Sequence, residues 1–251
     1  MKLQYIIPGP MHKTSVGMEE VNRRLAKLQG WASAETEVTI STVSSGPASI
    51  ESMYEEYLSV PGTAKNIIKA ESEGHDATIV GCFGDPGLDG LREVSDKLVV
   101  GPAGASMGTA VTLGQKFSVV TVTDSIINGL EKLAWETGVY QKLQSVRAIN
   151  LPVMEINKNH DLAVELLIKE GKKAIDKDKA EVLILGCMSM GFLDVADKMM
   201  EELGVPVINP SKVSLKFAEA LVSSNLEHSK KGYMKPPKME NNKRIEDLFI
   251  K

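Results

Sequence analysis

The sequence predicts an α/β fold made of two pseudosymmetric, doubly wound domains, each with a parallel four-stranded sheet. Three observations lead to this prediction. Short apolar runs rich in β-branched residues alternate with helical patterns along the chain, as in parallel sheets covered by helices on both faces. The alternation restarts near residue 101. A strand that ends in glycine and cysteine occurs twice, at Gly81-Cys82 and at Gly186-Cys187.

Length and composition fit an ordinary soluble globular protein. The chain has 251 residues, of which 43% are apolar and 25% charged, so it can bury a substantial core. Its formal net charge of −4 gives no basic field for nucleic acid or an anionic membrane surface. No apolar run approaches the ~20 residues that a membrane span needs, and the apolar start is too short for a signal peptide. We therefore expect a cytoplasmic protein whose partner is a small molecule.

The first half contains four expected strands, each a short apolar or alternating β-branched run. Their expected bounds are 3–7, 36–43, 77–82 and 98–100. Thr14 or Ser15 is expected to cap the helix after the first strand. Ser49 is expected to cap a long helix that extends through residue 70, and Pro61 to interrupt it.

The second half repeats the alternation. Its expected strands, again apolar and rich in valine, isoleucine or leucine, cover 117–122, 145–149, 182–187 and 205–208. Helical periodicity marks the connecting segments, and it is strongest at 160–176, where one face is apolar. The expected helices are 103–113, 124–137, 160–176, 191–203 and a last long helix over 211–226.

The strands of the two halves correspond in order, which indicates a structural duplication. Cys82 and Cys187 hold matching positions 105 residues apart. Because the last helix follows the eighth strand, we expect it to pack back on the first half. The expected domains are therefore residues 1–100 plus 209–251, and residues 101–208. The lysine-rich tail over 229–251 is expected to be an extended surface arm anchored by Leu248, Phe249 and Ile250.

The only two cysteines are the first candidates for a reactive site. A single cysteine is more often a small buried hydrophobe, but two at matching positions favour a functional pair. Cys82 and Cys187 each end a strand before a turn and a helix, where the helix dipole favours a thiolate. If the halves face each other, one thiol lies on each face of a planar substrate in the cleft. One thiolate can then remove a proton while the opposite thiol returns one, which inverts a stereocentre.

The carbanion formed in such a reaction needs stabilisation. Backbone N–H groups in the turns at Phe83-Gly84 and Met188-Ser189 are the expected donors to an enolate oxygen. The role of Asp85 has two possible explanations. It either orients or assists Cys82, or it is the N-cap of a helix that begins at Pro86.

No cofactor and no metal are expected. The sequence has no lysine motif for a Schiff base and no phosphate-binding glycine motif after its first strand. The histidines are scattered and make no metal set, and the last two are expected at the surface; they are His12, His75, His160 and His228.

One stretch resembles a known signature. The segment Cys82-Phe83-Gly84-Asp85-Pro86-Gly87-Leu88, followed by Arg92-Glu93, is similar to the first-cysteine motif of hydantoin and allantoin racemases. These enzymes belong to the aspartate/glutamate racemase superfamily. Matching segments extend over nearly the whole chain, at 46–52, 61–62, 117–121, 146–148, 185–187, 204–208, 216–221 and 229–233.

The resemblance implies a cofactor-independent racemase in which Cys82 and Cys187 are the paired acid and base. The residues that it places around the substrate, as backbone donors or as neighbours, are Phe83, Gly84, Met188, Ser189, Ser49, Thr121 and Thr123. Pro8 and Gly9 hold the substrate-binding positions where the family has Pro-Asn followed by Thr or Ser. We also expect a homo-oligomer.

Three departures separate this sequence from the family pattern. Pro8-Gly9-Pro10 lacks the asparagine and hydroxyl side chains, Met188-Ser189-Met190 replaces Ala-Gly-Met, and Gly104 replaces an acidic residue. The expected function is racemisation at a carbon next to a carbonyl, in a 5-substituted hydantoin or a related cyclic ureide such as allantoin. Two alternatives stay open. They are racemisation of an amino acid such as aspartate or glutamate, and a non-catalytic small-molecule binding protein of the same fold.

Overall fold

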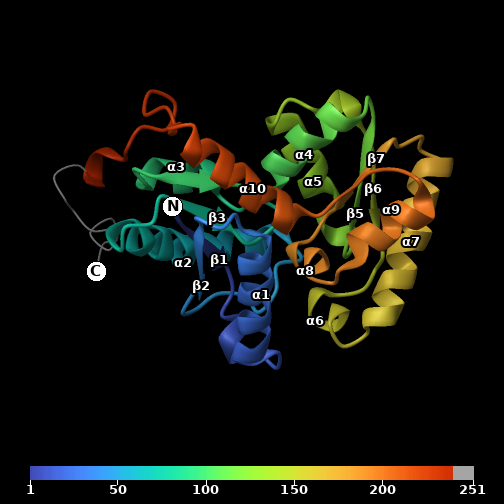
Figure 1. Ribbon diagram of the computed structural model, residues 1–251, viewed down its shortest axis with the longest axis horizontal. Helices are drawn as coiled ribbons and strands as arrows, with labels where there is room; N and C mark the ends of the chain where they lie inside the picture. The colour runs from blue at the N-terminus through green and yellow to red at the C-terminus, as the bar shows by residue number, and fades with distance from the viewer. Residues whose placement is uncertain (240–251) are drawn as a thin grey trace.

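The computed structural model describes residues 1–239, which form two α/β halves side by side (Figure 1). Each half has a parallel four-stranded sheet, and the strand orders are β2-β1-β3-β4 and β6-β5-β7-β8. The second sheet therefore repeats the topology of the first, and the predicted fold class is confirmed. The strands are β1 (Lys2–Ile7), β2 (Glu37–Thr42), β3 (Ala77–Val80), β4 (Leu98–Val100), β5 (Phe117–Thr121), β6 (Leu143–Ala148), β7 (Val182–Leu185) and β8 (Val207–Ile208).

Helices cover both faces of each sheet. On the first sheet α1 and α10 lie on one face and α2 and α3 on the other; on the second, α4 and α5 lie opposite α7 and α9. Among the described residues, no helix has the length and apolar character to cross a membrane. The helices are α1 (Gly17–Trp31), α2 (Met53–Ser72), α3 (Leu88–Val94), α4 (Pro102–Leu113), α5 (Ile127–Glu136), α6 (Val153–Ile156), α7 (His160–Asp176), α8 (Met188–Gly191), α9 (Val195–Leu203) and α10 (Pro210–Ser223).

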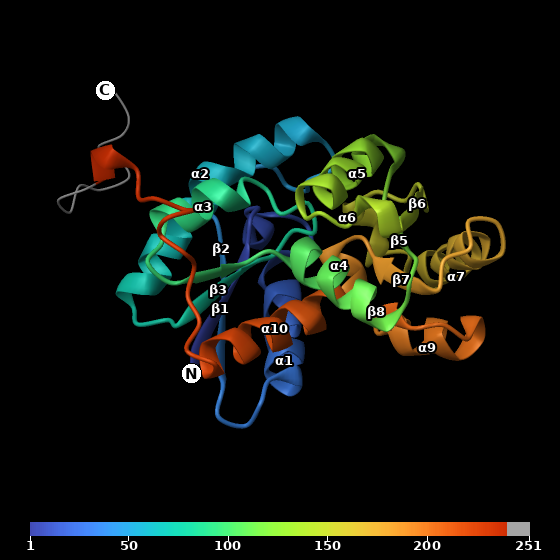
Figure 2. The ribbon, with the colours of Figure 1, turned by 90° about the horizontal axis from the view of Figure 1, so that it is seen from above.

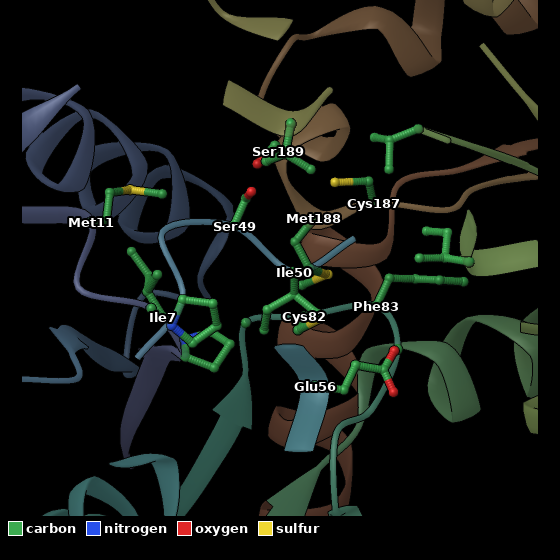
Figure 3. Close-up of a pocket in the computed structure, with 18 of the residues that line it drawn as sticks. Ile7, Met11, Ser49, Ile50, Glu56, Cys82, Phe83, Cys187, Met188 and Ser189 are labelled. Atoms are coloured by element: carbon green, nitrogen blue, oxygen red, sulfur yellow. The ribbon is translucent and has the colours of Figure 1, made fainter. Parts of the chain in front are cut away.

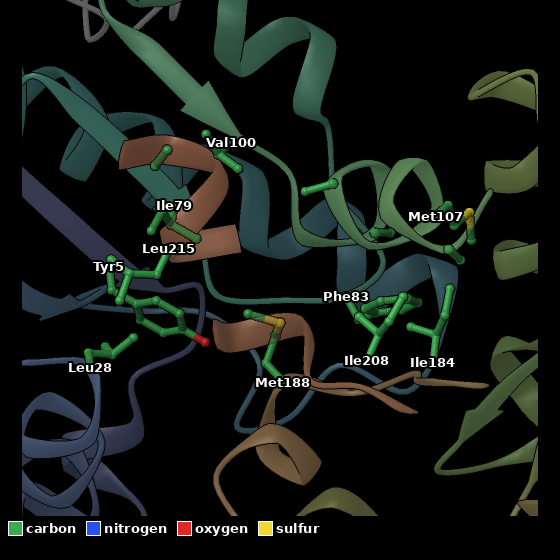
Figure 4. Close-up of a cluster of buried hydrophobic side chains, with 14 of the residues drawn as sticks. Tyr5, Leu28, Ile79, Phe83, Val100, Met107, Ile184, Met188, Ile208 and Leu215 are labelled. Atoms are coloured by element: carbon green, nitrogen blue, oxygen red, sulfur yellow. The ribbon is translucent and has the colours of Figure 1, made fainter. Parts of the chain in front are cut away.

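The largest hydrophobic cluster extends from one sheet to the other (Figure 4). It contains Tyr5 and Ile79 of the first sheet and Phe117 and Ile184 of the second, all almost completely buried. Leu215 of α10 belongs to the same cluster and is itself fully buried. The two halves therefore share one continuous core.

The chain passes between the halves twice. Gly101 joins β4 to α4, and Asn209 joins β8 to α10. Each is followed by a proline in the first turn of the helix, Pro102 or Pro210. Proline has no N–H, but N–H groups of the first turn have no partner within the helix, so no hydrogen bond is lost. From its crossing, α10 packs against α4 and then across α1, β3 and β4 of the first half (Figure 2).

The predicted cap of α1 is wrong. The helix begins at Gly17 after Val16, and no side chain caps its first turn. Thr14 instead donates its hydroxyl to the carbonyl oxygen of Met11, 2.7 Å away, and closes the 3₁₀ turn Met11–Lys13. Gly17 has a φ of +58°, so it supplies the bend between this turn and the helix.

Ser52, and not Ser49, is the N-cap of α2. Its Oγ accepts a hydrogen bond from the N–H of Glu55 at 3.3 Å, and its hydroxyl donates to the Glu55 carboxylate at 2.9 Å. The same carboxylate accepts from the N–H of Glu51, the residue before the cap, at 2.8 Å, so it ties the incoming chain to the first turn of the helix. Ser49 stays in the preceding loop.

Pro61 does not interrupt α2, which continues to Ser72. Pro61 and Tyr57, whose carbonyl loses its helical partner, both lie on the exposed face, where water can bond to that oxygen. On the opposite face, Ser59 donates to the Glu56 carbonyl at 2.7 Å and Thr63 to the Ser59 carbonyl at 2.9 Å. The buried face of α2 therefore keeps the helix intact across the proline.

The helix predicted over 191–203 begins four residues later, as α9, and a separate short helix, α8, precedes it. α8 begins directly after Cys187 and ends at Gly191, and α9 begins at Val195. Asp194, between them, has a φ of +58° and forms an ion pair with Lys27 of α1. The break therefore coincides with a contact between the halves.

The beginning of the C-terminal tail is attached to the edge strand β4. His228 Nε2 accepts a hydrogen bond from the N–H of Val99 at 2.9 Å, and Arg92 donates to the Tyr233 hydroxyl at 3.0 Å. His228 is thus half-buried, contrary to prediction, and burial lowers its pKa to about 4. The predicted anchor at Leu248, Phe249 and Ile250 lies outside the described residues.

Candidate active site

A cavity lies between the two halves, at the carboxyl ends of the inner strands (Figure 3). The space between its lining residues amounts to about 680 Å³ when the open solvent at its mouth is included. Cys82 enters it from the loop after β3, and Cys187 enters it directly after β7 and Gly186. Because β3 and β7 hold equivalent places in the two sheets, the cysteines reach one space from opposite halves.

Most of the predicted substrate-binding residues line the same cavity as the cysteines. They are Pro8, Gly9, Ser49, Phe83, Gly84, Met188 and Ser189. Side chains of the second half add an apolar wall, formed by Val122, Ile126, Leu130 and Val153. Most of the lining is therefore apolar, and its charged members are Arg24 and Glu56.

Thr121 and Thr123 do not line the cavity. Thr121 is fully buried, and its hydroxyl donates to the carbonyl oxygen of Gly186 at 3.0 Å. The Thr123 hydroxyl lies 2.9 Å from that of Ser125 at the surface. Thr121 thus supports the residue before Cys187, and neither hydroxyl faces the space between the thiols.

The position of Gly9 explains why this chain carries no side chain there. A Cβ atom at Gly9 would lie 2.7 Å from the carbonyl oxygen of Pro47. The loop that carries Ser49 therefore leaves no room for a side chain at position 9.

The Cys187 thiol lies at the start of a helix. Cys187 is the N-cap of α8, so its sulfur lies at the helix end that carries the unbonded N–H groups of Ser189 and Met190, without a cap hydrogen bond to them. Burial raises the pKa of the Cys187 thiol, while these N–H groups and the charge of Arg24 act in the opposite direction.

The Cys82 thiol lacks such a helix. The next helix, α3, begins only at Leu88, because Asp85 and Gly87 adopt φ values of +48° and +62° and extend the loop. Burial raises the pKa of the Cys82 thiol far above its ordinary range, and the negative charge of Glu56 adds to the effect. The N–H of Gly84 has the opposite effect on the pKa of this thiol and lowers it. The predicted helix dipole at Cys82 is therefore wrong.

Asp85 caps a helix of the other half. Its carboxylate accepts hydrogen bonds from the N–H groups of Ala103 at 3.1 Å and Gly104 at 3.0 Å, at the start of α4. The expectation that it caps the following helix is wrong, since Gly87 precedes α3. Burial raises the pKa of Asp85 to about 7. An acidic side chain at position 104 would lie beside this carboxylate, which accounts for Gly104 here.

Arg24 is a lining residue absent from the predicted site. It belongs to α1, is 3% exposed, and donates from Nη2 to the Ser189 hydroxyl at 2.9 Å. Its Nε pairs with Glu20 at 2.7 Å. The sequence contains one indication of this role: Arg24 is a charged residue within the apolar stripe of α1, between Val21 and Leu28.

Glu56 is the second charged residue that was not predicted. It lies on the buried face of α2, is 9% exposed, and reaches the cavity beside Gly84 (Figure 3). Its carboxylate makes no hydrogen bond or ion pair with any residue in the part of the chain that the structure describes. Burial and the nearby Asp85 raise the pKa of Glu56 to about 7.

No metal site accompanies these residues. Within residues 1–239, no group of three or more histidine, cysteine, aspartate or glutamate side chains is arranged to hold a metal ion.

Comparisons with known proteins agree with this architecture. The chain is 39% identical to a hydantoin racemase of Pseudomonas sp. (strain NS671) over 241 residues, which covers 96% of this chain and 94% of the relative. It is 38% identical to a hydantoin racemase of Rhizobium meliloti over 197 residues, or 78% of this chain and 81% of the relative. The solved structure of an allantoin racemase from Klebsiella pneumoniae matches it with a TM-score of 0.87 at 27% identity, over 99% of this chain and 98% of that one.

Fold, cavity and relatives together define the class of protein: the chain is an isomerase that acts as a racemase. The model of the Asp/Glu/Hydantoin racemase family matches residues 14–218, more than half of the chain. The chain therefore belongs to the Asp/Glu/Hydantoin racemase family.

Proposed function

We propose that this chain is a cofactor-independent racemase of a 5-substituted hydantoin or a related cyclic ureide such as allantoin. Cys82 and Cys187 are the acid and base of the proposed reaction. The observation that carries the proposal is the presence of both thiols in one cavity, each from a different half. The hydantoin racemases among its relatives and its likeness to an allantoin racemase support the substrate class.

The proposed reaction moves one proton across the ring plane. One thiolate removes the proton from the ring carbon, and the electron pair of the C–H bond moves into the adjacent carbonyl to form an enolate. The opposite thiol then donates its proton to the other face, and the electron pair returns to form the new C–H bond. The charge has moved from one sulfur to the other, so each turnover leaves the pair ready for the opposite enantiomer. For the enolate oxygen we propose N–H donors in the turns of Phe83-Gly84 and Met188-Ser189.

The lining favours a cyclic ureide over a dicarboxylic amino acid. Among the described residues around the cavity, Arg24 is the one basic side chain, and its guanidinium already pairs with Glu20. Aspartate or glutamate carries two carboxylates, which require several charge-assisted partners. The apolar wall around Leu130 and Val153 instead suits the substituent of a hydantoin ring.

Proton exchange in D₂O tests the proposal. Each enantiomer of several 5-substituted hydantoins, of allantoin, of aspartate and of glutamate is followed by NMR and by optical rotation, against a blank without enzyme. We expect deuterium to enter the stereocentre of a ureide as its rotation decays. If no ureide exchanges or loses rotation above the blank, the proposal is wrong. Ureide binding by thermal shift without turnover, unchanged in Cys187→Ala, would support a binding protein instead.

Three broader properties are also proposals. We propose domains of residues 1–100 plus 209–251 and of residues 101–208, and the contacts of α10 with β3 and β4 support this division. We further propose a cytoplasmic homo-oligomer. Light scattering after size exclusion tests the oligomeric state.

A further inference from the structure

The two cysteines occupy equivalent places in the two sheets, but the charged side chains beside them differ in sign. We propose that Arg24, acting through Ser189, holds the resting negative charge on Cys187, while Glu56 keeps the proton on Cys82. The inference rests on the proposed two-cysteine function. In this scheme Arg24 and Glu56 are positioning residues, because they act through the two thiols.

The positive charge near Cys187 belongs to a cluster on α1 in which Arg24 and Glu20 are buried and Arg23 is partly exposed. Glu20 pairs with Arg24 at 2.7 Å and with Arg23 at 2.7 Å, so one carboxylate faces two guanidinium groups. The Arg24 guanidinium also lies 4.9 Å from the centre of the Phe192 ring, which holds it in place. The cluster therefore keeps a net positive charge on the Cys187 side of the cavity.

Ser189 links that charge to the sulfur. Ser189 follows Cys187 by two residues, and its Oγ accepts a hydrogen bond from Arg24, so its own hydroxyl hydrogen is not used in that bond. In the proposal this hydrogen turns toward the sulfur when Cys187 is charged, and Ser189 lowers the pKa of this thiol. The N–H groups of Ser189 and Met190 act in the same direction and lower the pKa of this thiol, against the effect of burial. Hydrogen bonds to the charged form favour the thiolate.

The surroundings of Cys82 have the opposite sign. Glu56 is a buried carboxyl without a hydrogen-bond partner among residues 1–239, and Asp85 follows in the same loop as Cys82. Lys132 of α5 faces Glu56, but it is paired with Glu136 at 3.4 Å. Above its pKa of about 7, Glu56 is ionised, and a second negative charge on Cys82 becomes unfavourable.

No other described ionisable group reverses this asymmetry. Tyr5 lies close to both cysteines, and burial raises the pKa of its hydroxyl far above its ordinary range, so it stays neutral. The charge of each thiol also disfavours ionisation of the other. The pair therefore carries a single negative charge, and the environment assigns it to Cys187.

The asymmetry has a kinetic consequence. In the major resting form the thiolate is on Cys187, and this form reacts with the enantiomer whose proton faces Cys187. The other enantiomer needs the minor form, with the thiolate on Cys82. Because that form is sparsely populated, the apparent affinity for the second enantiomer is lower. The two enantiomers have equal free energy in solution, so kcat/KM is equal in both directions. The second enantiomer is therefore expected to show a larger KM and a correspondingly larger kcat.

Titration of the single-cysteine chains tests the inference without any substrate. The remaining thiol of Cys82→Ala and of Cys187→Ala is followed by thiolate absorbance and by the rate of iodoacetamide alkylation across pH. We expect Cys187 to titrate at least about one pH unit below Cys82. Equal midpoints, or a lower midpoint for Cys82, would overturn the inference.

Added substitutions separate the charges from the fold. In the Cys82→Ala chain, Arg24→Met and Ser189→Ala are each expected to raise the Cys187 midpoint, and Arg24→Lys to restore it in part. Arg23→Met is the comparison variant, because it lowers the charge of the same cluster but leaves the bond from Arg24 to Ser189, so it is expected to raise the midpoint less than Arg24→Met does. In the Cys187→Ala chain, Glu56→Gln is expected to lower the Cys82 midpoint. Unchanged midpoints in Arg24→Met and Ser189→Ala would exclude the assigned roles.

The outcome of this titration is independent of the outcome of the racemisation test of the proposed function. If the midpoints differ as expected and no ureide is racemised, the charge asymmetry holds and the substrate class is wrong. If ureides are racemised and the midpoints coincide, the proposed function holds and this inference is wrong.

Discussion

Cys82 and Cys187 both take part in each direction of the proposed reaction, one as base and the other as acid. Cys82→Ala and Cys187→Ala are therefore each expected to lower racemisation at least ~10²-fold from either enantiomer. Polarimetry from both enantiomers measures this, and an unchanged circular dichroism spectrum shows that the variant is folded. Full activity in Cys187→Ala would contradict the two-base mechanism.

Gly81 permits the close approach of β3 and β1 just before Cys82. A Cβ at this position would lie 2.6 Å from the carbonyl oxygen of Ile6 and 2.8 Å from the ring of Tyr5. Gly81→Ala is therefore expected to lower the free energy of unfolding by about 1–3 kcal/mol, as overpacking does. Urea unfolding measures the change.

Gly90→Ala is the matched control for this substitution. Gly90 lies inside α3, and a Cβ added there would have nothing within 4 Å, so alanine adds helix propensity without a clash. We expect a gain of about 0.5–1 kcal/mol in the free energy of unfolding. A loss equal to that of Gly81→Ala would show that contact with Tyr5 is not the cause.

Glu56 is expected to make stability depend on pH. Its pKa is raised from 4.5 to about 7 in the folded chain, so between these values the folded state holds a proton that the unfolded state releases. Stability from this group is complete below about pH 4.5 and is lost as the pH rises through 7. The stability of Glu56→Gln relative to the unchanged chain should therefore increase by on the order of 2 kcal/mol from acid to neutral pH.

Comparison with the unchanged chain isolates Glu56 from other titrating groups. His228, with its lowered pKa, favours folding as the pH rises and so acts in the opposite sense. It is present in both chains and cancels in the difference. Glu19→Gln, at an exposed position of α1, is the control, and an equal pH trend there would contradict the assignment.

Individual site residues differ in how far the sequence predicts them. Cys82 and Cys187 follow from their repeated strand-glycine-cysteine setting, and both line the cavity. Arg24 does not, because its place in an apolar helical stripe gives no hint of the Ser189 hydroxyl, which is distant in sequence. Thr121 shares a strand end with the cavity but points its hydroxyl at Gly186.

At the scale of elements, the cap of α2 fixes the helix that carries Glu56. Ser52→Ala removes the hydroxyl that bonds both Glu55 groups, and we expect a loss of about 1 kcal/mol in the free energy of unfolding. Ser72→Ala, at the exposed end of the same helix, is the control and should change stability by less than about 0.5 kcal/mol. Equal losses in the two variants would argue against the capping role.

Regular elements are predicted well where one signal dominates. The amphipathic helix α7 has its predicted bounds, His160–Asp176, because its apolar stripe is uninterrupted. Prediction fails where tertiary contacts decide, as at Pro61, which the buried face of α2 tolerates. It also fails at the break before α9, where Asp194 turns to meet Lys27 of the other half.

At the scale of the whole molecule, the shared core predicts cooperative unfolding. Trp31 stacks on Phe192, which comes from the other half, and Trp135 stacks on Tyr140 within the second half. We expect Trp31→Phe and Trp135→Phe, each with one tryptophan left, to report coincident fluorescence and far-ultraviolet transitions. A Trp135 transition that precedes loss of helix would show that the second half unfolds alone.

The duplicated topology is predictable because the strands of the two halves follow one another in the same order along the sequence. The two sheets of the structure have the same strand order. The relation between the halves is not predictable in the same way. It depends on contacts such as the Asp85 cap on α4, which joins a loop of one half to a helix of the other. Neither the loop around Asp85 nor the start of α4 has a sequence pattern that would predict this contact.

The two chain crossings have a mechanical consequence. In residues 1–239 the halves are covalently joined only at Gly101 and Asn209, and a proline-led helix stiffens the chain after each joint. Any clamshell motion must therefore pivot about the line through these two residues. The backbone torsion angles at these two residues then determine how wide the mouth of the cavity opens. The hydrogen bonds from α4 to Asp85 lie close to Gly101, and they resist rotation of one half against the other.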